Sequence, residues 1–226
     1  MRSPVLSFAI VGSLLSSCAS SPNLIAQRLA ATPASDHAYI IGTYVVSCEP
    51  RNERCAQAFN SLSTYYRAID NKDARGRLNS TSGSVFGTDT VHDFVDLEHK
   101  EKGFHFCVAL PPGDYAFHTF DFYNFAGGGS GYSLPEKSQF ALPFTLAAGE
   151  VAYVGRLKLT TSTGQNIFGM KLPAPGILLL SSDSTAMQAA ALHKCPESVW
   201  SKSIRDATLK AAATNGNPLV QVEPGR

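Results

Sequence analysis

Histidine and acidic side chains that could bind a metal ion are concentrated between residues 89 and 101, in the sequence DTVHDFVDLEHKE. In a helix, His92, Asp96 and His99 would share one face, because residues three or four apart are neighbours there. Imidazole and carboxylate ligands together suit a transition metal. However, residues 94–110 favour a β-hairpin with a turn at 100–103, which breaks this face. We therefore expect a solvated charged segment without a metal or other cofactor, and keep metal or small-ligand binding as an alternative function.

Two histidines on expected strands could serve a hydrolase. His105 and His118 lie among aromatic residues, and they would form a site if they faced each other across a sheet. The glycine-rich run at 127–132 does not supply the nucleophile: a nucleophile elbow needs Gly-x-Ser-x-Gly, and the residue two after Ser130 is Tyr132. We interpret this run as a hairpin tip, predict no catalytic residues, and keep a hydrolase with an unrecognised site as a second alternative.

Aromatic side chains are unusually dense between residues 115 and 144, and one strand face can bury only about half of them. The others are expected near the glycine-rich tip or on the opposite face, where they would contact a protein or a glycan: Phe120, Phe122, Phe125 and Tyr132. In the alternative interpretation, C-terminal helices carrying Trp200 cover these side chains.

The N-terminus has the pattern of an export signal. Arg2 precedes an apolar run at Val5–Leu15, which is much shorter than the roughly 20 residues of a spanning helix. The next residues, Leu-Ser-Ser-Cys ending at Cys18, resemble a bacterial lipobox. The resemblance implies removal of residues 1–17, lipidation of Cys18 and a membrane anchor made of several acyl chains. Ala19, the residue after Cys18, resembles the class of lipoproteins that is sorted to the outer membrane. The expected location is therefore the outer membrane of a two-membrane cell, where the lipid anchors the protein and its folded part faces the periplasm.

 

The net charge of the chain argues against nucleic acid as a partner. The whole sequence has 19 Lys and Arg against 18 Asp and Glu, and loss of Arg2 with the signal peptide makes these numbers equal. A near-neutral chain lacks the basic surface that binds nucleic acid, and no cluster of four or more basic residues follows Cys18 to hold an anionic membrane surface.

The remaining cysteines favour disulfides in an oxidising compartment. They are Cys48, Cys55, Cys107 and Cys195, and four cysteines allow three pairings. Cys48 and Cys55 flank a short polar turn and could form a local bridge, in which case Cys107 would join Cys195 across a long loop. A zinc site is the weaker alternative, because the sequence contains no Cys-x-x-Cys pair.

The rest of the chain is predicted to form one mainly β domain. Residues 18–36 are expected to be a flexible tether, 37–183 an antiparallel β-sandwich, 184–213 two helices packed on it, and 214–226 a loose tail. Alternation of apolar residues predicts several strands, and Pro143 favours an edge position for its strand. The expected strands are Ala38–Ser47, Ser61–Ile69, Phe104–Leu110, Asp114–Phe122, Phe140–Leu146, Val151–Leu159 and Ile177–Leu180.

A short motif resembles a known group of sandwich modules. Residues 110–117 read Leu-Pro-Pro-Gly-Asp-Tyr-Ala-Phe, and residues 143–155 contain Gly-Glu-Val-Ala-Tyr-Val-Gly. This is similar to the turn-and-strand of prealbumin-like modules, and to uncharacterised bacterial lipoproteins with a PPG-x-Y strand. The resemblance implies an immunoglobulin- or prealbumin-like sandwich in which Gly113 forms the turn and Tyr115 packs inward. We expect a non-enzymatic binding or structural module for an envelope protein or a cell-wall component.

Overall fold

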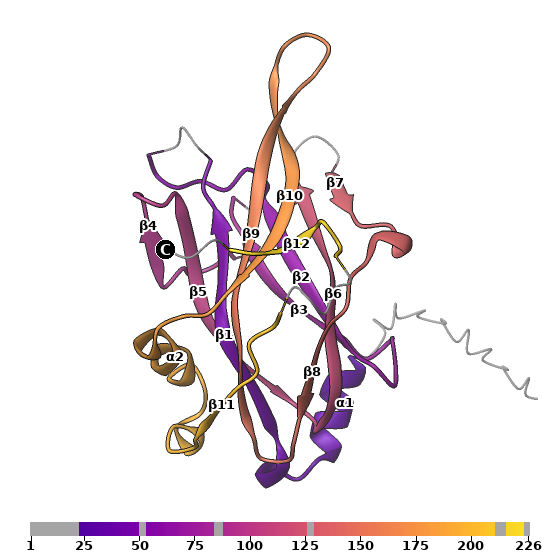
Figure 1. Ribbon diagram of the computed structural model, residues 1–226, viewed down its shortest axis with the longest axis vertical. Coiled ribbons are helices and arrows are strands. Elements are labelled where there is room, and N and C mark those ends of the chain that lie inside the picture. Colours follow the sequence, from indigo (N-terminus) through magenta and orange to yellow (C-terminus); the bar gives the residue numbers. More distant parts are fainter. Residues whose placement is uncertain (1–22, 50–52, 84–87, 126–128, 211–215, 224–226) are drawn as a thin grey trace, which may run out of the picture.

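The computed structural model describes residues 23–49, 53–83, 88–125, 129–210 and 216–223, so the signal peptide and Cys18 lie outside the described residues. The fold is mainly β, with two sheets (Figure 1). The larger sheet has the order β12 (Val220–Val222), β10 (Lys171–Ser181), β9 (Val151–Gln165), β1 (Ala38–Ser47), β5 (Glu101–Leu110) and β4 (Phe94–Asp96), with β11 (Ile204–Asp206) also paired to β9. The smaller sheet has the order β3 (Arg75–Thr81), β2 (Ser61–Ala68), β6 (Gly113–Asn124) and β7 (Ser130–Ser133), with β8 (Leu142–Leu146) also paired to β6.

The larger sheet is mixed, and the expectation of a purely antiparallel fold is therefore wrong. Strand β1 runs antiparallel to β5 but parallel to β9. The two short C-terminal strands are also parallel to their partners, β11 to β9 and β12 to β10. Alternation along a strand reports which residues share a face, but it carries no information about the direction of a neighbour that is distant in sequence.

The main hydrophobic core lies between the two sheets. Large buried side chains from β1 and β9, such as Tyr44 and Leu157, pack in one cluster with Leu62 of β2 and Phe117 of β6. Strand β1 is buried along nearly its whole length, because a second apolar cluster around Ile41 covers its other face. The central strands are therefore covered on both faces, and the loops and hairpins extend from them.

The N-terminal helix belongs to the folded body. Helix α1 spans Leu24–Ala31, and the side chain of Asn23 caps it by accepting hydrogen bonds from two backbone N–H groups. Ile25 is buried in the core, and Arg28 forms an ion pair with Asp70. The expectation of a flexible tether as far as residue 36 is therefore wrong from Leu24 onward.

The C-terminal region contains one of the two expected helices. Helix α2 spans Thr185–Leu192, as predicted, and it begins after Ser184, whose hydroxyl caps it. The second helix is absent among residues 197–210: a short 3-10 turn at Glu197–Val199 is followed by strand β11. The loose tail is likewise wrong for β12, which pairs with β10 and buries Val220. In residues 204–206, pairing with β9 has overridden the local helical pattern.

In the short motif, Gly113 forms the turn and Tyr115 packs inward, as expected. Gly113 has a φ of +151°, a conformation that side chains rarely adopt, and Tyr115 is buried with its hydroxyl donating to the carbonyl of Pro111 at 2.8 Å. Pro143 lies on β8, which pairs with β6 alone among the described strands, in agreement with an edge position.

The described part of the chain contains no helix with the length and apolar character of a membrane span.

Candidate functional site

Both predicted disulfides are present. Cys48 pairs with Cys55, with 4.6 Å between their Cα atoms, and Cys107 pairs with Cys195, with 5.2 Å. The first closes a local loop. The second joins β5 to the segment after α2, across 88 residues, and holds that segment against the outer face of the larger sheet.

Two of the four aromatic residues predicted to bind a partner are buried. Phe120 and Phe122 have no exposed surface and lie in the core between the sheets. The cause is a β-bulge: Tyr65 pairs with Thr119 and Tyr66 with Phe117, so His118 is an extra residue on β6. The bulge shifts the alternation by one, and Phe120 points inward together with Phe117. The prediction of exposure is therefore wrong for these two residues.

The other aromatic residues form a small surface group. Tyr123 and Tyr132 are each about 40% exposed, and Phe125 is half-buried against the ring of Tyr123. The alternative of a C-terminal lid is also wrong, because residues around α2 pack on the larger sheet, and Trp200 stacks on His193. The middle of the glycine-rich tip, residues 126–128, lies outside the described residues.

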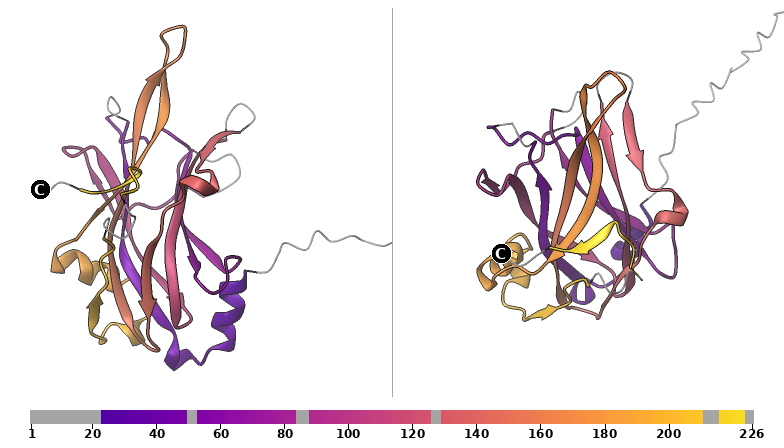
Figure 2. Two further views of the ribbon diagram at one scale, coloured as in Figure 1. Left: turned by 45° about the vertical axis from the view of Figure 1, so that its right-hand side comes forward. Right: turned by 45° about the horizontal axis from the view of Figure 1, so that its top comes forward.

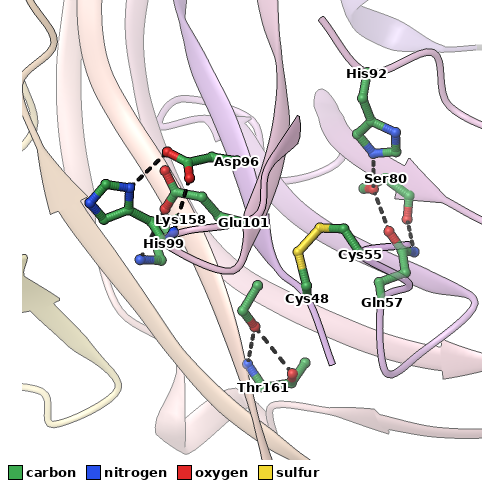
Figure 3. The surroundings of a disulfide bond; sticks show 11 residues. Cys48, Cys55, Gln57, Ser80, His92, Asp96, His99, Glu101, Lys158 and Thr161 are labelled. Carbon is green, nitrogen blue, oxygen red and sulfur yellow. Dashed lines mark hydrogen bonds and ion pairs between the residues drawn. A yellow bond between two sulfur atoms is a disulfide. The ribbon is translucent and has the colours of Figure 1, made fainter. Parts of the chain in front are cut away.

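The three possible metal ligands are not brought together. The segment forms the predicted hairpin, in which β4 pairs with β5. His99 contacts Asp96 at 2.8 Å, whereas the Nε2 atom of His92 lies 3.2 Å from the hydroxyl of Ser80 on β3 (Figure 3). Burial, followed by the nearby charge of Lys102, lowers the pKa of His92 to about 4. Among the described residues, no group of three or more His, Cys, Asp or Glu could hold a metal.

The two strand histidines do not face each other, since His105 lies on β5 of the larger sheet and His118 on β6 of the smaller one. The hydroxyl of Thr43 donates to Asp183, so the Nδ1 atom of His105, at 3.1 Å, must donate to Thr43. In a hydrolytic triad the histidine stands between the hydroxyl and the carboxylate. Here the fully buried Thr43 stands between His105 and Asp183, and this order favours a structural role for His105.

A buried network of charges crosses the outer face of the larger sheet. Arg156 lies 2.6 Å from Glu101, and Lys158 bridges Glu101 and Glu223 at 3.2 and 2.8 Å. Asp183 lies 4.0 Å from Arg156. The sequence shows Arg156 and Lys158 on the same side of β9, but their partners Glu101 and Glu223 come from β5 and from the residue after β12, which are distant in the sequence. All these groups have partners within the network, so removal of one cation would leave a buried carboxylate uncompensated.

The most exposed apolar group lies at the tip of the β9–β10 hairpin. The four side chains, with their exposed fractions, are Ile167 (93%), Phe168 (79%), Met170 (56%) and Leu172 (48%). Beyond Thr161, β9 and β10 pair with no other described strand than each other, and the hairpin projects from the body (Figures 1 and 2). Sequence analysis did not identify this site, although its run of apolar residues around Gly169 is visible in the sequence.

The tip is an ordered turn. The side-chain oxygen of Asn166 accepts hydrogen bonds from the backbone N–H groups of Phe168 and Met170, each at 3.0 Å. Gly169 has a φ of +75°, which favours glycine, and its N–H donates to the carbonyl of Asn166. The apolar side chains are thus held outward by the backbone of the turn.

Comparison with known proteins adds little. No protein family model matches the chain, and no curated protein matches it. A solved leucine-rich repeat protein from Bacteroides thetaiotaomicron is similar over 57% of this chain and 14% of its own, with 11% identity and a TM-score of 0.31. The chain therefore spans a small part of that protein, and the likeness is too weak to carry an argument.

Proposed function

We propose that this protein is an exported lipoprotein that is anchored through Cys18 and binds another protein of the cell envelope through the tip of the β9–β10 hairpin. The observation that carries the proposal is the cluster of exposed apolar side chains on an ordered, projecting turn. Soluble proteins rarely expose such groups together without a partner. Phenylalanine and methionine are also enriched at protein interfaces.

The position of the tip favours a protein partner over the anchoring membrane. The tip lies at the opposite end of the molecule from α1 in both views in which the long axis is vertical (Figures 1 and 2). Helix α1 begins six residues after Cys18, so a lipid at Cys18 would hold the α1 end near the bilayer. The hairpin would then point away from that bilayer, toward a partner with an apolar groove.

We also propose that the two sheets form a prealbumin-like sandwich. A prealbumin-like sandwich is supported by the inward-packed Tyr115 and its bond to Pro111, which resembles a tyrosine corner. Parallel pairing of β1 with β9 departs from the antiparallel form of such modules. The site is non-enzymatic in this proposal, since the side chains that the turn presents, Ile167, Phe168 and Met170, are apolar.

Changing Ile167, Phe168 and Met170 together to serine should abolish in-cell crosslinking of the protein to its partner. These side chains are exposed, so each change should alter the free energy of unfolding by no more than about 0.5 kcal/mol. Crosslinking followed by mass spectrometry measures the loss. The matched control is Tyr123→Ser with Tyr132→Ser, which removes exposed aromatic rings elsewhere and should leave the crosslink intact. Loss of the crosslink in the tyrosine control alone would place the interface on the β6–β7 hairpin. An unchanged crosslink in both the hairpin-tip variant and the control would reject the proposal.

Replacing Cys18 by alanine tests the anchor separately. The variant should lose acyl labelling and move from the membrane to the soluble fraction, because the acyl chains supply the membrane affinity. Fractionation of cells that express each form measures this. A variant that still takes up fatty acid, or stays membrane-bound when the hairpin is also mutated, would contradict lipidation at Cys18.

A further inference from the structure

A groove of about 740 Å³ lies against the smaller sheet, away from the tip of the β9–β10 hairpin. Side chains of β2, β3 and β6 line it, together with the segment after β7 and Asn23. Its charge is strongly positive, since the lining includes Arg67, Lys72, Arg75 and Arg77 against one carboxylate, Asp121. That carboxylate already accepts a hydrogen bond from the hydroxyl of Tyr65 at 2.6 Å.

The four cations have no acidic partner in the part of the chain that the structure describes. None of them forms an ion pair with a described residue, whereas Arg28, Arg156 and Lys158 all do. Arg67 and Arg75 are directly opposite each other on β2 and β3. Like charges in such a pair are destabilising. An anion between them would remove this repulsion.

His118 adds a buried polar group to the same site. The bulge places it in the lining, the residue is only 6% exposed, and its Nδ1 atom has no hydrogen-bond partner among the described residues. Burial, followed by the charges of Arg67 and Arg75, lowers its pKa to about 4. The ring is therefore neutral near pH 7, when it has one N–H donor to offer a ligand.

We propose that this groove binds a phosphate-bearing ligand between the guanidinium groups of Arg67, Arg75 and Arg77, with Lys72 and His118 as further donors. Guanidinium groups bind phosphate oxygens through paired hydrogen bonds. Several cations around one site match the dense charge of a phosphate better than that of a single carboxylate. The volume exceeds that of one phosphate, so the groove has room for a larger group beside it. The site does not depend on the hairpin interface.

The phosphate belongs either to a membrane lipid or to a soluble molecule. Asn23 lines the groove and is five residues from Cys18, a reach of at most about 18 Å in an extended chain. A lipid anchor at Cys18 would thus bring the groove close to lipid headgroups. This placement rests on the proposed anchor, whereas the phosphate site itself does not.

Calorimetric titration of the full chain with pyrophosphate tests the site. Binding should weaken at least about tenfold in the Arg67→Gln, Arg75→Gln variant, because two charge-assisted contacts are lost. The control Lys100→Gln, Lys210→Gln has the same net charge but leaves the groove intact, and should bind like the parent protein. If the first variant does not fold, Lys72→Gln with Arg77→Gln replaces it. Absence of pyrophosphate binding, or equal weakening in groove and control variants, would overturn the proposal.

A second arm identifies the source of the phosphate. The Cys18→Ala chain is mixed with vesicles of phosphatidylglycerol and, separately, of phosphatidylcholine. Groove-dependent binding to phosphatidylglycerol that pyrophosphate displaces assigns a lipid headgroup, and binding of pyrophosphate alone assigns a soluble phosphate; both support the site. The serine variant of the hairpin should still bind pyrophosphate, so failure of the partner proposal and failure of the phosphate proposal remain distinguishable.

Discussion

Replacing both Cys107 and Cys195 by alanine is expected to lower the free energy of unfolding by roughly 4 to 5 kcal/mol. The bridge spans 88 residues, and the chain-entropy gain of a disulfide rises with the length of the loop that it closes. The bridge between Cys48 and Cys55 spans only 7 residues, so the corresponding double variant should lose about half as much. Urea unfolding of the three proteins under oxidising conditions measures the difference.

The two double variants are each other's controls, because both remove two buried or half-buried sulfur atoms. Equal losses would mean that cavities left by the missing atoms, and not loop closure, dominate the effect. Since Cys195 lies just after α2, amide hydrogen exchange in α2 should accelerate in the first variant and remain unchanged in the second.

Replacing Arg156 by methionine is expected to cost about 3 to 5 kcal/mol, because it leaves buried carboxylates without their cation. The side chains of Arg156, Glu101 and Asp183 are each at least 93% buried. The matched control is Arg28→Met, whose ion pair with Asp70 is exposed and should contribute no more than about 1 kcal/mol. Chemical denaturation at pH 7 measures both losses, and a loss below about 1 kcal/mol for Arg156→Met would contradict the structural role of the network.

The pH dependence gives this prediction a second readout. Burial acts to raise the pKa of Glu223, but the hydrogen bond and charge of Lys158, with help from Ser181 and Arg156, hold it below its ordinary value of 4.5. A carboxylate with a lowered pKa in the folded state stabilises the protein above pH 4.5, and this contribution is lost as the pH falls further. The advantage of the parent protein over Arg156→Met should therefore shrink below pH 4.5.

Strand positions were predictable because alternation is a local property. The expected strands at Ala38–Ser47 and Ser61–Ile69 agree with β1 and β2 to within one residue. Other strands extend beyond their expected ends: β10 includes Pro173 and Pro175, which suggested a turn. Prolines are tolerated there because, among the described strands, only β9 pairs with this part of β10.

The candidate sites were less predictable, for a physical reason that His118 illustrates. One extra residue in β6 reverses the faces of everything after it, so Phe120 and Phe122 become core residues. The same bulge buries His118 beside cations from β2 and β3, which are distant from it in the sequence. A bulge depends on pairing with a neighbouring strand, so alternation along β6 alone could not reveal it.

By itself, the sequence determined the mainly β fold, the positions of several strands and the first C-terminal helix, which follow from local periodicity and capping residues. It left three cysteine pairings open, and the structure decided between them. Only the tertiary structure decided that β1 is parallel to β9, that residues 204–206 and 220–222 join the sheet as strands, and that Arg156 is buried. These outcomes depend on which distant segments meet, and the free energy of those contacts exceeds local preference.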